Sequence, residues 1–237
     1  MKKRVGILTS GGDCPGLNAT LRGVAKALYQ RMGENVELIG ISNGYAGLIN
    51  GDWRVMEPHE FSGILTVGGT ILGTKRTPFK LMRVVEEDKV DKVAAMKRNY
   101  QEMKLDCLLC LGGNGTHKTA NLLAEEGLNI IALPKTIDND IFGTDVTFGF
   151  HSAMEIATEA IDRVHTTAGS HSRCMVVELM GNKAGWLTPG VRTSSLSRSS
   201  PIPLRMYARP LSAGRLRGST SPFWRWPREP WTPRRPG

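Results

Sequence analysis

The sequence predicts an α/β protein with a doubly wound, mostly parallel sheet that carries helices on both faces. Short apolar runs alternate with helix-like segments along residues 1–188, which is typical of βαβ units. Glycine-rich turns follow three of the apolar runs. Hydrophobic residues make up 40% of the 237 residues, which is enough for a sizeable core.

The elements are expected in alternating order. Apolar runs predict strands at residues 4–9, 36–42, 105–111, 129–133 and 174–180. Helical spacing predicts helices at residues 19–31, 89–103, 118–126 and 152–166. Ligands of such sheets bind beyond the carboxyl ends of the strands, and the glycine-rich turns fall at those ends.

The positive charge lies in one segment of the chain. The net charge is +9, and residues 189–237 hold ten arginines against one acid, Glu229, so residues 1–188 are close to neutral. This segment is rich in Pro, Arg, Ser and Trp and shows no period, so we expect a largely disordered basic tail. Because the charge belongs to the tail, nucleic acid is not the expected partner, although an RNA-binding fragment stays an alternative of another class.

Two further patterns concern location and cysteine chemistry. No apolar stretch approaches the roughly 18 residues of a membrane span, and no signal peptide is recognised, so a cytoplasmic protein without a membrane partner is expected. Cys107 and Cys110 form a C-x-x-C motif within an apolar run. Without a second pair or a His cluster, we expect buried strand cysteines and no zinc site.

Two glycine-rich turns stand between a strand and a helix. The first is Ser-Gly-Gly-Asp at residues 10–13, and the second is Gly-Gly-Asn-Gly-Thr at residues 112–116. Glycine lets the backbone approach a phosphate, and the helix N-terminus offers free N–H groups. Alone, the first motif also fits a simple tight turn.

A third motif, Pro-Lys-Thr-Ile-Asp-Asn-Asp, occupies residues 134–140 after a predicted strand. It sets two carboxylates beside Lys135, which suits phosphoryl transfer: one carboxylate accepts a hydroxyl proton and the other helps to hold a metal. A solvated Asp-Asn-Asp turn is the alternative. The two glycine-rich turns favour the functional interpretation.

The chain resembles the 6-phosphofructokinase family over residues 3–188. Gly-Gly-Asp, Gly-Gly-x-Gly-Thr, Pro-Lys-Thr-Ile-Asp-Asn-Asp and Val-Glu-Leu-Met-Gly carry the resemblance, in matching order and spacing. The resemblance implies a phosphotransferase of glycolysis that moves a phosphoryl group from ATP to the 1-hydroxyl of fructose 6-phosphate with Mg²⁺. It also implies a homo-oligomer, since intact relatives are usually tetramers.

The resemblance implies roles for individual residues as well. Donor binding is implied for Gly11, Arg76, Gly113, Asn114, Gly115 and Thr116. Sugar-phosphate binding is implied for Thr136, Ile137, Asp138, Arg173, Met180, Gly181 and Asn182, with Arg173 reaching the substrate of a neighbouring subunit. Asp138 is implied as the base that deprotonates the 1-hydroxyl, and Asn114 and Asp140 are implied to lie at the magnesium.

Three positions bear on the metal and the donor. The family usually has Asp where this chain has Asn114, which bears on metal affinity. Members that use pyrophosphate usually carry Asp at the position of Gly115 and Lys at that of Lys135. Gly115 leaves room for the α-phosphate of ATP, whereas Lys135 supplies charge that replaces part of it. ATP is therefore the expected donor, with pyrophosphate as the alternative.

Two basic residues, Arg22 and Lys26, match positions that bind a nucleotide effector in regulated bacterial relatives. A solvated helix face explains them equally well.

The family pattern stops after Thr188. Moving the reading frame back by one base over residues 192–207 gives a run that begins with Ala-Asp-Val-Ile-Leu-Ile-Pro-Glu, close to the strand that the family carries there, and residues 223–231 become family-like in the same way. We interpret residues 189–237 as a frameshifted, non-native segment. The expected consequences are an incomplete second half of the sheet and the sugar site, exposed apolar faces, poor solubility and negligible kinase activity.

Overall fold

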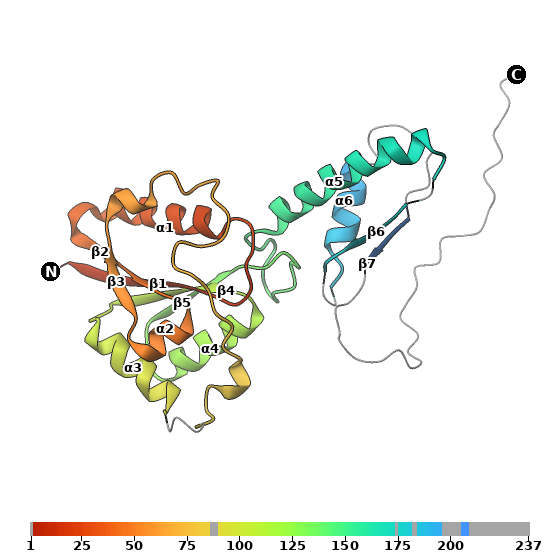
Figure 1. The fold of residues 1–237 in the computed structure, drawn as a ribbon. Helices are drawn as coiled ribbons and strands as arrows, with labels where there is room; N and C mark the ends of the chain where they lie inside the picture. The colour runs from red at the N-terminus through yellow and green to blue at the C-terminus, as the bar shows by residue number, and fades with distance from the viewer. Residues whose placement is uncertain (1, 86–89, 174, 182–183, 196–204, 209–237) are drawn as a thin grey trace, which may run out of the picture.

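The computed structural model describes residues 2–85, 90–173, 175–181, 184–195 and 205–208 (Figure 1). Its main body is a five-stranded sheet in the order β3-β2-β1-β4-β5. The strands are β1 (Lys3–Ser10), β2 (Val36–Ile41), β3 (Trp53–Met56), β4 (Cys107–Gly112) and β5 (Ile130–Pro134). All pair in parallel except β3, which is antiparallel to β2. The predicted mostly parallel α/β sheet is confirmed.

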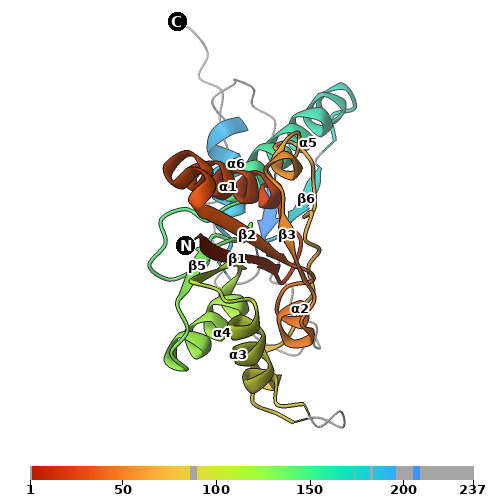
Figure 2. The same cartoon turned by 90° about the vertical axis from the view of Figure 1, so that its left-hand side faces the viewer.

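Helices cover both faces of this sheet. Figures 1 and 2 place α1 (Leu17–Met32) on one face and α2 (Tyr45–Asn50), α3 (Lys92–Glu102) and α4 (Asn114–Glu125) on the other. Successive strand side chains point to opposite faces, so Ile7 packs in the cluster under α1 and Leu8 packs in the cluster under the other helices. Short 3₁₀ turns connect these elements at Gly33–Asn35, Pro58–Phe61 and Phe79–Leu81.

The elements differ in detail from the sequence expectations. α2 and β3 were not expected, and α4 begins at Asn114, four residues before the predicted start. The second glycine-rich motif therefore forms the first turn of a helix instead of a loop that precedes it. Cys110 is buried and Cys107 is partly buried on β4, as expected.

A second unit follows the sheet. It contains α5 (Phe150–Ser170), β6 (Val176–Leu179), α6 (Leu187–Ser195) and β7 (Arg205–Ala208), with β6 and β7 paired in parallel. The predicted strand at 174–180 is thus present, but it pairs with β7 and not with the five-stranded sheet. Figure 1 shows α5 leading away from the sheet to this unit.

The expected boundary at residue 188 falls inside α6. Leu187 and Val191 lie one helical turn apart and are both buried, and α6 packs on α5. Within the expected tail, the structure describes residues 189–195 as part of α6 and residues 205–208 as β7. Residues 196–204 and 209–237 lie outside the described part of the chain, so the disordered tail stays a prediction.

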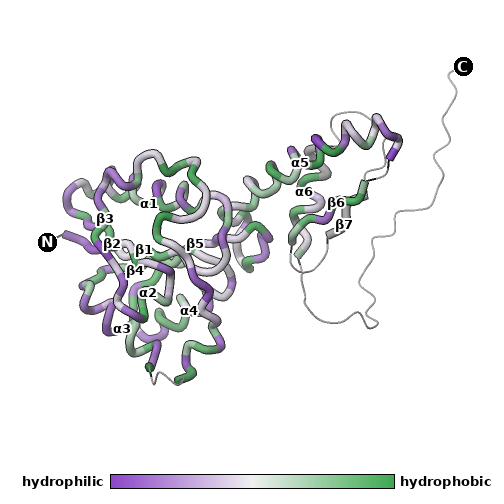
Figure 3. The backbone as a smooth tube through the Cα atoms, viewed as in Figure 1, coloured by the Kyte–Doolittle hydropathy of each residue, from purple (hydrophilic) through white to green (hydrophobic). Residues whose placement is uncertain are grey.

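Apolar side chains are exposed on the second unit. In the 21-residue helix α5 only Ile161 and Ala168 are buried, whereas Ile156 is 60% exposed and Val176 on β6 is 65% exposed. Figure 3 shows the hydrophobic stretches along α5 and α6. The expected exposed apolar faces are present; poor solubility stays a prediction. Among the described helices, none is long and apolar enough to cross a membrane.

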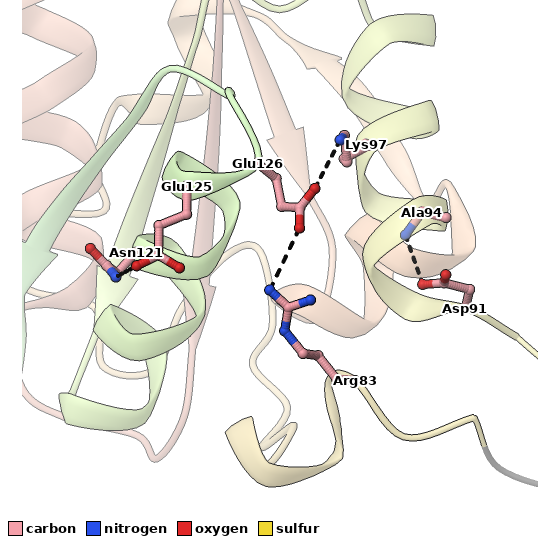
Figure 4. Close-up of polar contacts among 7 residues, drawn as sticks. All are labelled: Arg83, Asp91, Ala94, Lys97, Asn121, Glu125 and Glu126. Carbon is pink, nitrogen blue, oxygen red and sulfur yellow. Dashed lines mark hydrogen bonds and ion pairs between the residues drawn. The ribbon is translucent and has the colours of Figure 1, made fainter.

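A charged network joins α3 to α4 at the end of α4 opposite its glycine-rich turn (Figure 4). Glu126 accepts ion pairs from Lys97 at 3.0 Å and from Arg83 at 3.6 Å, and these cations lower the pKa of its carboxyl, Lys97 more than Arg83. The Asp91 side chain accepts a 3.0 Å hydrogen bond from the amide of Ala94 and thereby caps α3. These contacts hold α3 against α4 at the end of α4 that lies away from the glycine-rich motif.

Candidate active site

The strand order reverses between β1 and β4, and the three motifs meet there. Ser10 at the end of β1 pairs with Gly112 at the end of β4, and Gly112 pairs with Pro134 at the end of β5. An open α/β sheet has its binding crevice at such a reversal, beyond the carboxyl ends of the strands. The sequence motifs of residues 10–13, 112–116 and 134–140 therefore meet at this edge of the sheet, and we call this region the crevice.

The turn after β1 depends on glycine. Gly11 has φ +99° and Gly16, which precedes α1, has φ +86°, a conformation that other residues rarely adopt. The Gly11 carbonyl accepts a 2.9 Å hydrogen bond from the Thr74 hydroxyl, and its amide donates to the Lys75 carbonyl at 3.4 Å. A Cβ on Gly12 would lie 3.0 Å from an Nη atom of Arg76. Arg76 thus lies against the turn, and its role in donor binding stays a prediction.

The turn into α4 is locked from two sides. A Cβ on Gly112 would lie 2.3 Å from the Thr116 hydroxyl oxygen, so this close approach requires glycine. The Thr116 hydroxyl donates to the Ser10 carbonyl at 3.3 Å, and the Tyr45 hydroxyl donates to the Thr116 carbonyl at 2.8 Å. Thr116 is buried and its polar groups are used within the protein, so it positions this turn.

Asn114 and Gly115, by contrast, lie exposed in the first turn of α4, and Gly113 precedes them at the N-cap. A Cβ added at Gly115 would meet no atom within 4 Å. The N-terminal amides of α4 therefore face open space, where an anion can bind.

Lys135 connects the third motif to the first. The residue is only 4% exposed, and its ammonium donates a 2.6 Å hydrogen bond to the carbonyl of Gly12. Burial lowers the pKa of Lys135, while the neighbouring Cys14 and Asp13 act in the opposite direction and Arg76 adds to the decrease. Two cations, Lys135 and Arg76, thus flank the turn after β1.

Asp138 lies in the same crevice, half-buried. Burial raises the pKa of its carboxyl, the charge of Asp140 adds to the increase, and Lys135 partly opposes it. Its Oδ1 atom is buried and has no hydrogen-bond partner within the described residues. The Asp140 carbonyl accepts a 3.3 Å hydrogen bond from the Asn114 side chain. This bond joins residues 134–140, which we call the carboxylate loop, to α4.

A second layer holds the carboxylate loop in place. Thr147 is 2% exposed, and its hydroxyl donates to the Thr136 carbonyl at 2.6 Å. Its amide donates to the Asn139 side chain at 2.9 Å. Asn139 has φ +49°, in the left-handed region that Asn tolerates better than most residues, and the Thr136 hydroxyl accepts a 3.1 Å hydrogen bond from the Asp138 amide.

Sequence reasoning missed two residues at the base of the crevice, Cys14 and Gly149. Gly149 has φ +97° at the N-cap of α5, and a Cβ there would lie 2.1 Å from the Cys14 sulfur. Burial raises the pKa of Cys14 to about 11, so the thiol stays neutral. The one available signal was the glycine in front of a predicted helix.

The remaining expected residues do not join this cluster. Arg173, Met180 and Gly181 flank β6 in the second unit (Figure 1), where Arg173 and Met180 are exposed. Ile137 packs against the small buried cluster of Cys14, Leu17 and Leu111. Asn182 lies outside the described residues. Of the two proposed effector residues, Arg22 donates to the Phe61 carbonyl at 2.7 Å and Lys26 is exposed, which fits either interpretation.

Known proteins are similar to this chain in sequence and fold. The ATP-dependent 6-phosphofructokinase of Spirochaeta thermophila is 64% identical over 185 residues, which are 77% of this chain and 50% of that protein. The pyrophosphate–fructose 6-phosphate 1-phosphotransferase of Amycolatopsis mediterranei is 46% identical over 185 residues, 78% of this chain and 51% of that protein. The solved phosphofructokinase structure from Saccharomyces cerevisiae matches with a TM-score of 0.70 and 32% identity, covering 78% of this chain and 27% of that chain.

The chain spans about half the length of the curated relatives it matches. The family model described as Phosphofructokinase matches residues 4–195, from the first strand of the sheet through α6. Since this match takes in the crevice and all three of its motifs, the chain belongs to the phosphofructokinase family.

Proposed function

We propose that the crevice serves phosphoryl transfer from ATP to the 1-hydroxyl of fructose 6-phosphate. One observation carries the proposal: the Lys135 ammonium donates to the Gly12 carbonyl and the Arg76 guanidinium lies against Gly12, while Asp138 follows Lys135 by three residues on the same loop. Phosphoryl transfer needs positive charge on the moving group and a carboxylate that accepts the hydroxyl proton. The turn and the carboxylate loop supply these two needs side by side.

The donor half of the site consists of the two glycine-rich turns. Gly11 and Gly113 allow the backbone to approach phosphates, and Asn114 and Gly115 open the N-terminus of α4 to an anion. The open space beside Gly115, where a Cβ would meet no atom within 4 Å, is the proposed place of the nucleotide. Thr116 contributes by holding this turn against Ser10.

Asp138 is the proposed base of the acceptor half. A raised carboxyl pKa makes the carboxylate a stronger base, and the half-buried Asp138 carboxylate is the proposed acceptor of the 1-hydroxyl proton. Thr136 and Ile137 lie beside it as the proposed contacts to the sugar phosphate. Arg173, Met180, Gly181 and Asn182 are proposed to complete the sugar site, with Arg173 acting on a neighbouring subunit's substrate.

The residues around Asp138 fit Mg²⁺. The carboxylate of Asp140 and the side-chain oxygen of Asn114 are hard oxygen ligands, and the Asn114 amide nitrogen already contacts the Asp140 carbonyl. Mg²⁺ typically uses one or two carboxylates together with substrate phosphates, so a small protein ligand set suffices. When bound, the ion neutralises charge on the donor phosphates.

A second candidate, pyrophosphate-dependent transfer, is favoured by Lys135. Its buried ammonium lies at the turn after β1, where it can replace charge that a nucleotide otherwise supplies. The open space at Gly115 favours ATP, since the Asp that pyrophosphate users carry there both fills that space and repels a nucleotide. We retain ATP as the proposed donor.

Calorimetry on the full chain tests the donor assignment. MgATP is expected to bind more tightly than magnesium pyrophosphate, and both should bind more weakly after Arg76→Met. Binding of neither donor to the wild-type chain would contradict the proposal. RNA binding that weakens with salt and disappears on deletion of residues 189–237 would support the non-catalytic alternative instead.

The proposal extends to assembly and location. We propose a homo-oligomer in the cytoplasm for the frame-restored protein, on the strength of the family resemblance. Sedimentation of that protein at several concentrations tests the oligomer, and a monomer at all of them contradicts it.

A further inference from the structure

The segment that delivers Arg76 to the crevice, residues 67–76, contains no described helix or strand; we call it the donor loop. Several of its residues are exposed, and a Cβ on Gly68 or Gly69 would meet nothing within 4 Å. A loop of this kind requires specific contacts to hold a single position.

The Asn18 side chain supplies those contacts from the first turn of α1. It is 1% exposed, and its amide nitrogen donates to the Val67 carbonyl at 3.0 Å and the Gly68 carbonyl at 3.3 Å. Its oxygen accepts a 2.8 Å hydrogen bond from the Ile71 amide. Three hydrogen bonds from one buried amide thus substitute for backbone pairing in the first half of the donor loop.

A second set of contacts carries this fixation towards Arg76. The buried Thr9 hydroxyl lies 3.0 Å from the Thr70 hydroxyl and donates to the Gly73 carbonyl at 2.8 Å. Thr74 then bonds to Gly11, as described above. The donor loop is therefore tied to the first turn of α1 in its first half and to the end of β1 and the turn after it in its second half.

We propose that Asn18 is a positioning residue for the donor site: it holds the donor loop so that the Arg76 guanidinium stays against Gly12 beside Lys135. The inference rests on the proposed function, in which Arg76 binds donor phosphates. Asn18 itself does not line the open space at α4. Asn18 affects donor affinity because it fixes the position of the Arg76 guanidinium.

The expected effect follows from the bonds that are lost. Asn18→Ala leaves two carbonyls and one amide of the donor loop without their partner, so the loop opens locally and the Arg76 guanidinium no longer keeps a single position. A hydrogen bond to a charged group is worth about 1.5–3 kcal/mol, so donor affinity should fall roughly 10- to 100-fold. Arg76→Met should weaken binding by a similar factor, and the double variant should lose little more than either one, because both changes remove the same contact.

The test uses the full 237-residue chain and two readouts. Calorimetry with MgATP and with magnesium pyrophosphate reports donor affinity. Amide hydrogen exchange reports the loop, and the Ile71 amide should exchange at least about tenfold faster in Asn18→Ala. Thr70→Val serves as a milder second variant in case Asn18→Ala fails to fold; it removes the Thr9 contact at a half-buried position.

Asn99→Ala is the matched control. Asn99 is also a buried amide, and it donates to the Leu48 and Ile49 carbonyls at 2.8 and 2.9 Å, away from the donor loop. It should cost comparable stability and leave both Ile71 exchange and donor affinity within about twofold of wild type.

Each outcome decides the inference. Faster Ile71 exchange together with weaker, non-additive donor binding supports it, whereas faster exchange with unchanged affinity, or additive losses with Arg76→Met, overturns it. Unchanged Ile71 exchange in both variants also overturns it. If the wild-type chain binds neither donor, the proposed function fails, and the exchange data still decide whether Asn18 holds the donor loop.

Discussion

The ammonium of Lys135 donates a 2.6 Å hydrogen bond to the carbonyl oxygen of Gly12, so a side chain that follows β5 reaches across the end of β4 to the turn after β1. The bond ties the carboxylate loop to the glycine-rich turn. It also fixes a buried positive charge at the place where the resemblance puts donor phosphates.

Lys135→Met should weaken binding of both donors. The substitution removes the buried charge and leaves the Gly12 carbonyl without its partner, and a charge-assisted bond of this kind is worth about 1.5–3 kcal/mol. Calorimetry should therefore show a loss of roughly tenfold or more, larger for pyrophosphate, which has no nucleoside to contribute. Lys97→Met, which disrupts the ion pair with Glu126 at the far end of α4, is the control and should leave both affinities unchanged.

Gly115→Asp should reverse donor preference without unfolding the chain. A Cβ at Gly115 meets no atom within 4 Å and the residue has no positive φ, so the fold tolerates a side chain there. The new carboxylate fills the open space at α4 and repels a nucleotide, so ATP affinity should fall by more than about tenfold. Pyrophosphate affinity should change far less; an equal loss for both donors would show that the space at Gly115 does not select the donor.

The elements that sequence reasoning found are those with a strong local signal. β1, β2, β4 and β5 are nearly continuous apolar runs, which is typical of buried parallel strands, although β5 lies at the edge of the sheet and is partly exposed. α2 has six residues, and β3 has four residues with only Met56 buried. Neither element is long enough to show a hydrophobic period. The sequence did not indicate that the strand predicted at residues 174–180 pairs with β7, because nothing in these residues specifies which strand they join.

The residues of the candidate site also fall into those with a local sequence signal and those without one. Gly11, Lys135 and Asp138 belong to contiguous motifs, so the resemblance could identify them. Asn18 and Thr147 act through hydrogen bonds to the backbone of other segments, and such bonds leave no pattern in a single sequence. Their roles follow from the folded arrangement.

Asp138→Asn should stabilise the chain at neutral pH. The pKa of Asp138 is raised in the folded state, chiefly by burial and then by Asp140, so the folded state favours the protonated carboxyl. The stability that this gives is present at low pH and lost as pH rises through the folded pKa. Asn removes that loss, and the gain stays below about 1 kcal/mol because solvent screens a partly exposed group.

Urea unfolding between about pH 4 and about pH 7 checks this sign. The two chains should be nearly equal in midpoint at the acid end, and the variant should be the more stable one at the neutral end. If the difference in stability between the two chains shrinks with rising pH, the raised pKa of Asp138 is contradicted.

Thr147→Val should damage the carboxylate loop while Thr147→Ser does not. Valine has nearly the same volume but cannot donate to the Thr136 carbonyl, so the 2.6 Å bond is lost in a buried place. An unpaired buried carbonyl costs about 1–3 kcal/mol, which denaturant unfolding should resolve. Serine restores the donor, and a loss of similar size in both variants would instead indicate a packing role for the methyl group.

The last prediction concerns turnover by the chain as it stands. Asp138, Lys135 and the glycine-rich turns are in place, so donor binding should survive. The resemblance places the remaining sugar-phosphate contacts after residue 188, where the sequence no longer follows the family, and the family match stops at residue 195. Phosphoryl transfer depends mainly on positioning and charge stabilisation. Losing half of the acceptor contacts should therefore cost several orders of magnitude in rate, at about 1.4 kcal/mol for each factor of ten.

A coupled assay for fructose 1,6-bisphosphate should accordingly detect negligible activity in the 237-residue chain and clear activity once the reading frame after residue 188 is restored. In the restored protein, Asp138→Asn should abolish turnover and leave MgATP affinity nearly unchanged, because the carboxylate acts on the acceptor hydroxyl and not on the donor. Rapid turnover by the unrestored chain would show that residues 1–188 suffice for the reaction. It would also remove the reason to regard residues 189–237 as a lesion.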